Sequence, residues 1–118
     1  PYHGFTVSDV WVVSGVTGGS VPNCICQSTE ASPANPVFEA ADPISAISFG
    51  SLLVSGTLTV EARTAGGTLV RSDSVNTADS VWRSTTLLYA VEDAVKKLVF
   101  VGAVDSWLVD DLSITTVT

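Results

Sequence analysis

Hydrophobic and polar residues alternate with a period of two along much of the chain, which is typical of β-strands with one buried face. In GTLTVEART, residues 56–64, the leucine, the valine and the alanine share one face, whereas the charged residues share the other. AGG at 65–67 is a turn sequence, and TLVRSDSV at 68–75 repeats the β-prone pattern. These two segments are therefore predicted to form a β-hairpin.

The same pattern recurs between clusters of turn-forming residues. Further strands are predicted at 5–13, 23–28, 36–40, 44–50, 80–90, 96–102 and 106–114. Turn residues fill 15–22, 31–36, 41–43 and 76–80. Helical spacing is weak, and we expect at most one helical turn near 91–95. Eight or nine short strands in 118 residues predict an all-β fold, an antiparallel β-sandwich that forms a single domain over residues 1–118.

The alternation also predicts which side chains form the hydrophobic core. The expected core residues are Phe5, Val7, Ile47, Phe49, Leu58, Val60, Leu98, Phe100, Leu112 and Ile114. Each of them lies on the apolar face of a predicted strand.

Charge narrows the range of partners. The formal net charge is -7, with five basic residues. A phosphate backbone would be repelled by this balance, so nucleic acid is not an expected partner. No apolar run reaches the roughly 18 residues of a membrane span. An acidic surface instead suits neutral glycans, divalent cations or simple solubility.

Composition favours an extracellular protein. Pro1 opens the chain without a methionine or a basic, apolar leader, as in a processed product or an excised domain. Serine and threonine are abundant and lysine is rare, as in many secreted chains. We therefore expect the protein to be secreted or located at the cell surface.

Two cysteines, Cys24 and Cys26, form a C-x-C pair in NCICQS. On a strand their Cα atoms would lie about 6.6 Å apart, near the upper end of the disulfide range. Three states stay open: two buried thiols, a strained disulfide, or bonds to another chain. A zinc site would need two more ligands, and His3 is the only histidine.

The sequence argues against an enzyme. One histidine, two residues from the start, is a poor basis for a nucleophile–base triad. A glycosidase carboxylate pair would have to come from Glu39, Glu61 or Glu92. Glu61 alternates with apolar residues in its strand, as a solvated residue does, so we expect no catalytic site.

Aromatic residues are the best candidates for binding a ligand, because a flat aromatic face can cover the apolar side of a sugar ring. Trp82 is the strongest candidate, since SVWRSTT surrounds it with polar residues. Trp11 and Tyr89 are the other candidates. The alternative for each of them is a place in the core.

Two adjacent aspartates, Asp110 and Asp111, interrupt the apolar C-terminal segment WLVDDLSITTVT. Neighbours on a strand point to opposite faces, so one carboxylate is expected to face inward. Asp110 has the parity of Leu108, Leu112 and Ile114, which we expect in the core, and is predicted to be the inward one. Asp111 is predicted to meet solvent. A buried carboxylate needs a cation, a metal or several hydrogen-bond donors.

These features together resemble a known group of proteins. YHGF near the start, ISAISFGSLLVSGTLTVEARTAGG, KKLVFVG and WLVDDLSI are similar to secreted jelly-roll β-sandwich domains. That group includes fungal secreted proteins of unknown function and carbohydrate-binding modules. The resemblance implies a jelly-roll topology and a structural calcium ion at Asp110, with Asp9 as the nearest acidic residue to the first strand. Hydrogen bonds from loop amides are the alternative to calcium.

Two functions follow as hypotheses. The first is a non-catalytic extracellular module that binds a glycan or a cell-wall polysaccharide. The second is a self-associating structural or adhesive protein that forms filaments or a surface coat, because few charges protect its strand edges. In that case the segment 5–13 could complete a neighbour's sheet by strand exchange.

Overall fold

The computed structural model describes residues 6–8, 11–14, 23–26, 35–103 and 106–117, with side chains for residues 35–103 and 106–117. The strands in these ranges are β1 (Thr6–Ser8), β2 (Trp11–Ser14), β3 (Asn23–Cys26), β4 (Val37–Glu39), β5 (Ile44–Leu53), β6 (Leu58–Arg63), β7 (Leu69–Val75), β8 (Arg83–Leu88), β9 (Lys97–Val101) and β10 (Trp107–Thr116). A short 3-10 turn, η1 (Val91–Asp93), lies where one helical turn was predicted.

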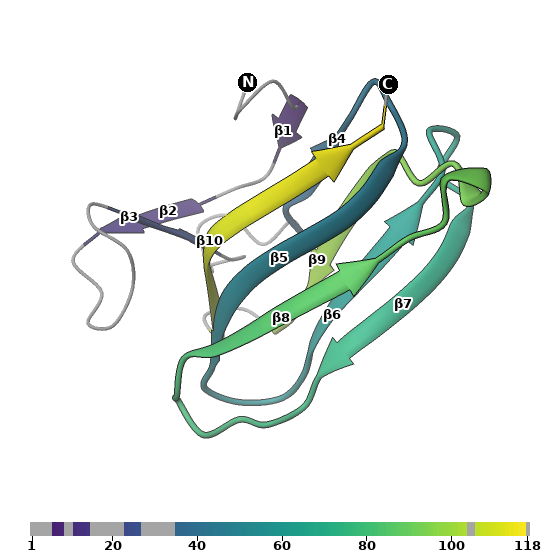
Figure 1. The fold of residues 1–118 in the computed structure, drawn as a ribbon. Coiled ribbons are helices and arrows are strands. Elements are labelled where there is room, and N and C mark those ends of the chain that lie inside the picture. The colour runs from purple at the N-terminus through teal and green to yellow at the C-terminus, as the bar shows by residue number, and fades with distance from the viewer. Residues whose placement is uncertain (1–5, 9–10, 15–22, 27–34, 104–105, 118) are drawn as a thin grey trace.

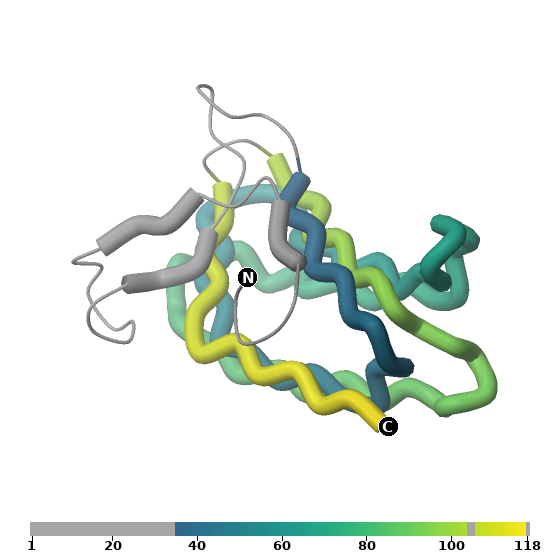
Figure 2. The backbone as a smooth tube through the Cα atoms, turned by 90° about the horizontal axis from the view of Figure 1, so that it is seen from above, coloured from purple at the N-terminus to yellow at the C-terminus, as the bar shows by residue number. Residues whose placement is uncertain are grey.

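The strands form two antiparallel sheets that face each other (Figure 1). The first, called sheet 1 below, has the order β1-β4-β9-β6-β7, and the second, sheet 2, has the order β2-β3-β10-β5-β8. The view along the layers in Figure 2 shows β10, β5 and β8 on one side and β4, β9 and β6 on the other. The predicted all-β fold with two antiparallel sheets is confirmed.

The N-terminal part differs from the prediction. The segment 5–13 was expected to be one strand, but it contains two short strands in different sheets. β1 pairs with β4 in sheet 1, and β2 pairs with β3 in sheet 2. Alternation along a segment cannot reveal a change of sheet, because both sheets bury every second residue. The expected count of eight or nine strands is therefore not reproduced.

The predicted core is largely confirmed between the sheets. The buried members are Ile47, Phe49, Leu58, Val60, Leu98, Phe100 and Leu112. Ile114 is only partly buried and packs against this cluster. The side chains of Phe5 and Val7 lie outside the described residues.

Phe100 on β9 joins the two sheets at the centre of the core. Its ring meets Phe38 of sheet 1 edge-on, with 5.7 Å between centroids. From sheet 2, Phe49 makes a second edge contact at 5.6 Å, and Trp107 stacks at 6.2 Å. Edge-to-face and offset-stacked contacts are the favourable geometries for aromatic pairs.

A β-bulge interrupts β10 at the two aspartates. Asp110 pairs with Gly50 of β5, whereas Ser113 pairs with Ser48, so two residues of β10 oppose Phe49 alone. Before the bulge Trp107 and Val109 face the core. After it the parity changes, and the core positions are Leu112 and Ile114.

The face predicted for Asp110 is therefore wrong in one respect. Asp110 is buried, with 4% exposed, as expected, but it does not share a face with Leu112. It alternates with Trp107 and Val109 and so lies on the outer face of sheet 2. The extra residue of the bulge, which the sequence pattern does not reveal, explains the difference.

Candidate functional site

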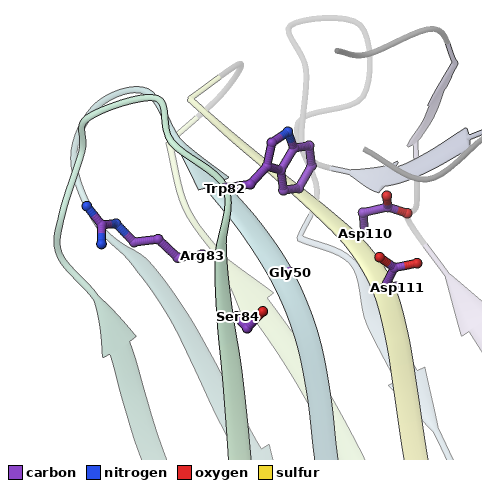
Figure 3. Close-up of a pocket in the computed structure, with 6 residues that line it drawn as sticks. All are labelled: Gly50, Trp82, Arg83, Ser84, Asp110 and Asp111. Atoms are coloured by element: carbon purple, nitrogen blue, oxygen red, sulfur yellow. The ribbon is translucent and has the colours of Figure 1, made fainter. Parts of the chain in front are cut away.

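A pocket of about 200 Å³ lies on the outer face of sheet 2. Its lining residues are Gly50, Trp82, Arg83, Ser84, Asp110 and Asp111. They come from β5, from the start of β8 and from β10, which are neighbours in sheet 2. Figure 3 shows the Trp82 indole above Gly50, with the two carboxylates of β10 beyond it.

The loop between β7 and β8 holds Trp82 in place. The backbone N–H of Ser80 donates to the carbonyl oxygen of Leu53 at 3.0 Å, which ties this loop to the end of β5. The Asp79 carboxylate accepts from the backbone N–H of Val81 at 3.2 Å. Trp82 follows directly and is partly buried at the edge of the pocket.

Gly50 lets the indole lie close to the sheet. A Cβ atom at this position would be 3.7 Å from Cε3 of Trp82 and 3.6 Å from the backbone oxygen of Asp110. These are ordinary contact distances, so a methyl group would just fit between the indole and the backbone of β10. A larger side chain here would fill the space between Trp82 and Asp110.

Arg83 lines the pocket, but its guanidinium group points away from the two aspartates of β10 (Figure 3). The guanidinium forms an ion pair with Asp79, four residues before it. The hydrogen bond from Arg83 is the main cause that lowers the pKa of the Asp79 carboxyl below its ordinary value. The charged groups that face the hollow are therefore carboxylates.

The bulge brings both aspartates to the same pocket. On a regular strand two neighbours would face opposite sides of the sheet. Asp111 instead adopts a left-handed backbone with φ of 53°, and it is exposed, as predicted. Asp110 is buried beside it. In bulges of this kind glycine is the usual residue at the left-handed position, because it has no Cβ.

This backbone gives a testable prediction for Asp111. We expect Asp111→Gly to be more stable than Asp111→Ala by about 1 kcal/mol, because only glycine adopts the left-handed region without strain. Both variants lose the same carboxylate, so the comparison isolates the backbone term. Urea titration of the two variants measures the difference. Equal stability would show that the bulge does not constrain this residue.

The described residues leave the calcium expectation at Asp110 untested. Within the residues whose side chains are described, no group of three or more histidine, cysteine, aspartate or glutamate side chains could hold a metal ion. Calcium takes six to eight oxygen ligands. Asp9, the second predicted ligand, lies outside the described residues. Calcium at Asp110 stays a prediction.

Tyr89 is not available as a sugar platform, which corrects the prediction. It lies at the opposite end of β8 from Trp82, belongs to the core and is 7% exposed. The guanidinium of Arg71 covers its ring, 4.7 Å from the centroid. Tyr89 is seven residues from Trp82 along an extended segment, so the two side chains face opposite sides of the sheet and Tyr89 turns inward. Trp11 lies on β2, paired with Cys26, and its side chain is outside the described residues.

Burial raises the pKa of Tyr89 to about 12, against a smaller lowering by the Arg71 charge. The unfolded chain releases this proton near pH 10, whereas the folded chain keeps it to about pH 12. The unfolded state then binds fewer protons, so the free energy of unfolding should fall as the pH rises from 10 to 12.

Denaturant titrations at pH 9 and pH 11 test this expectation, with Tyr89→Phe as the control. The free energy of unfolding of Tyr89→Phe should fall less at alkaline pH than that of the parent, because the variant has no phenol to titrate. It should fold well at pH 9, because the described residues supply no hydrogen-bond partner for the buried Tyr89 hydroxyl. Identical pH dependence of both proteins would contradict the raised pKa.

The glutamates considered for glycosidase chemistry lie elsewhere. Glu39 and Glu61 are on strands of sheet 1, where they pair with Lys97 at 3.9 Å and with Arg63 at 2.9 Å. Glu92 is exposed in η1. None of the three lines the pocket beside Trp82.

Sequence reasoning did not identify Gly50, Ser84 and Asp111 as members of the site. The first two are small residues of strand segments, and no local motif marks them. Their place in the pocket depends on the pairing of β5 with both β8 and β10. The polar setting of Trp82 in SVWRSTT was the usable signal, and the structure places this residue at the pocket.

No helix among the described residues is both long enough and apolar enough to cross a membrane. Comparison with models of protein families finds no match to this chain, and comparison with curated proteins finds none either.

Proposed function

We propose that this protein is a non-catalytic, extracellular module that binds a glycan. The observation that carries the proposal is the pocket on sheet 2 in which the Trp82 indole lies beside Asp110 and Asp111. An aromatic ring offers an apolar face to the C–H groups of a sugar. Carboxylate oxygens accept hydrogen bonds from sugar hydroxyls. A sugar ring needs both kinds of contact.

The shape of the pocket supports binding more than catalysis. It lies on the outer face of a sheet, and its volume of about 200 Å³ is below the roughly 300–1,000 Å³ of pockets that enclose a small molecule. The two adjacent aspartates lie together on one side of it, next to Trp82. A pair of glycosidase carboxylates instead flanks the scissile bond.

The strand order supports a jelly-roll topology. From β3 to β10 the chain alternates between the sheets except at the hairpin of β6 and β7. These strands have the orders β3-β10-β5-β8 and β4-β9-β6-β7, in which the first strand lies beside the last. A jelly roll has eight strands in two sheets built from two Greek keys.

Titration calorimetry with neutral oligosaccharides tests the proposed function. Suitable probes are oligomers of β-1,3-glucan, chitin and mannan, each at matched concentration. We expect one of the series to bind and Trp82→Ala to weaken it about tenfold, because the indole face is lost. Trp82→Tyr should retain part of the affinity.

Val81→Ala is the matched control, because Val81 is the exposed neighbour of Trp82 in the same loop but does not line the pocket. It should bind like the parent. Failure of all three series to bind, or equal binding by Trp82→Ala and the parent, would overturn the proposal. Circular dichroism of the variants shows whether the fold is retained.

Self-association is the second candidate, and exposed apolar residues at the sheet edges favour it. β7 and β8 end their sheets, and Leu69 and Leu88 on them are 48% and 68% exposed. Open, apolar strand edges promote association. Light scattering over a concentration series distinguishes the candidates: a monomer at high concentration excludes this one, and an oligomer lost in Leu88→Lys supports it.

A further inference from the structure

We infer that the ligand is a linear, uncharged glycan chain that extends from Trp82 along β5 and β8, and this inference rests on the proposed function. It concerns the length and charge of the ligand. The supporting observations are a second hollow beside the first, the rows of side chains across sheet 2, and the contrast with sheet 1.

The second hollow has a volume of about 180 Å³ and adjoins the pocket at Trp82. Both are lined by Gly50, Ser84 and Asp111, so they form one continuous groove. The second adds Ser48 and Thr86, which lie further along β5 and β8. Each hollow alone is smaller than the roughly 300–1,000 Å³ of pockets for drug-sized ligands. A ligand that occupies both must be elongated.

Strand register sets the chemistry of this groove. One row across the sheet consists of Asp110, Gly50 and Ser84. The next row consists of Ser113, Ser48 and Thr86. Residues in register share a face, so the second row places hydroxyl groups next to the aspartates. Hydroxyls both donate and accept hydrogen bonds, as the hydroxyls of a sugar do.

The two outer faces of the molecule differ in charge. Sheet 1 carries the ion pairs Lys97–Glu39 and Arg63–Glu61 on its outer strand positions. Along the groove of sheet 2, by contrast, the charged lining residues are Arg83, whose guanidinium is paired with Asp79, and the two aspartates. The protein as a whole carries a formal net charge of -7, so a sulfated or uronic-acid chain would be repelled, whereas a neutral chain would not. The groove thus fits an uncharged polysaccharide.

The test measures affinity against oligosaccharide length by titration calorimetry, from the monosaccharide to the hexasaccharide of the series that binds. Affinity should rise with length until both hollows are filled and then level off. Thr86→Val should weaken binding of the hexasaccharide about two- to tenfold, the effect of one lost hydrogen bond, and leave the monosaccharide unaffected. An oligomer of polygalacturonic acid should not bind.

Thr59→Val is the matched control, because Thr59 is a hydroxyl residue on the outer face of sheet 1, bonded to Ser74 at 3.0 Å. It should not change affinity for any oligomer. If monosaccharide and hexasaccharide bind equally while Trp82→Ala still weakens both, the extended groove is wrong and the proposed function stands. If no oligomer binds, both are wrong. Tight binding of the polygalacturonic acid oligomer would overturn the inference that the ligand is uncharged.

Discussion

Phe100→Ala is expected to lower the free energy of unfolding by about 3–5 kcal/mol, the range found for large aromatic residues removed from a core. Phe100 is 1% exposed and contacts the rings of Phe38, Phe49 and Trp107, which come from both sheets. Its removal leaves a cavity in the middle of the sandwich. Domains of this kind are stable by only about 5–15 kcal/mol, so the loss is a large fraction of the total.

Urea titration followed by circular dichroism measures this change. Val99→Ala is the control on the same strand, because Val99 is a half-buried residue on the outer face of sheet 1. It should cost much less than Phe100→Ala. A loss below about 1 kcal/mol for Phe100→Ala would contradict the central place of this ring between the sheets.

Gly102→Ala is the second substitution with a large expected effect, a loss of about 1–3 kcal/mol from overpacking. A Cβ atom at Gly102 would lie 2.4 Å from both Cδ1 and Nε1 of Trp107. Trp107 is 1% exposed and stacked on Phe100, so its indole is packed within the core. Either the loop after β9 or the core must shift.

Gly66→Ala is the matched control, because only the Thr64 hydroxyl oxygen, at 4.0 Å, lies near a Cβ atom there. We expect that variant to unfold like the parent. In the Trp107→Phe background, Gly102→Ala should lower the free energy of unfolding by less than it does in the parent, because the clash involves the indole. If Gly102→Ala costs the same free energy in both backgrounds, the destabilisation does not come from a clash with the indole.

Local sequence features indicated only some residues of the candidate site. The polar neighbours of Trp82 marked it as a ligand candidate, and the aspartate pair marked the end of the chain as unusual. Tyr89 carried the same aromatic signal but lies in the core. Trp82 and Tyr89 flank β8 at opposite ends and face opposite sides of sheet 2, and Arg71 packs over the ring of Tyr89. That packing depends on contacts between sheets, which no local pattern contains.

The sequence by itself determined the all-β class, most of the strands after residue 35 and most of the core, because burial of one strand face imposes a period of two on the residues. Tertiary structure alone decided the sheet order, the crossing of segment 5–13 between sheets and the bulge at Asp111. These features depend on which strands pair and in what register. The same pairing places Trp82, Gly50 and Asp110 at one pocket although they are far apart in the chain.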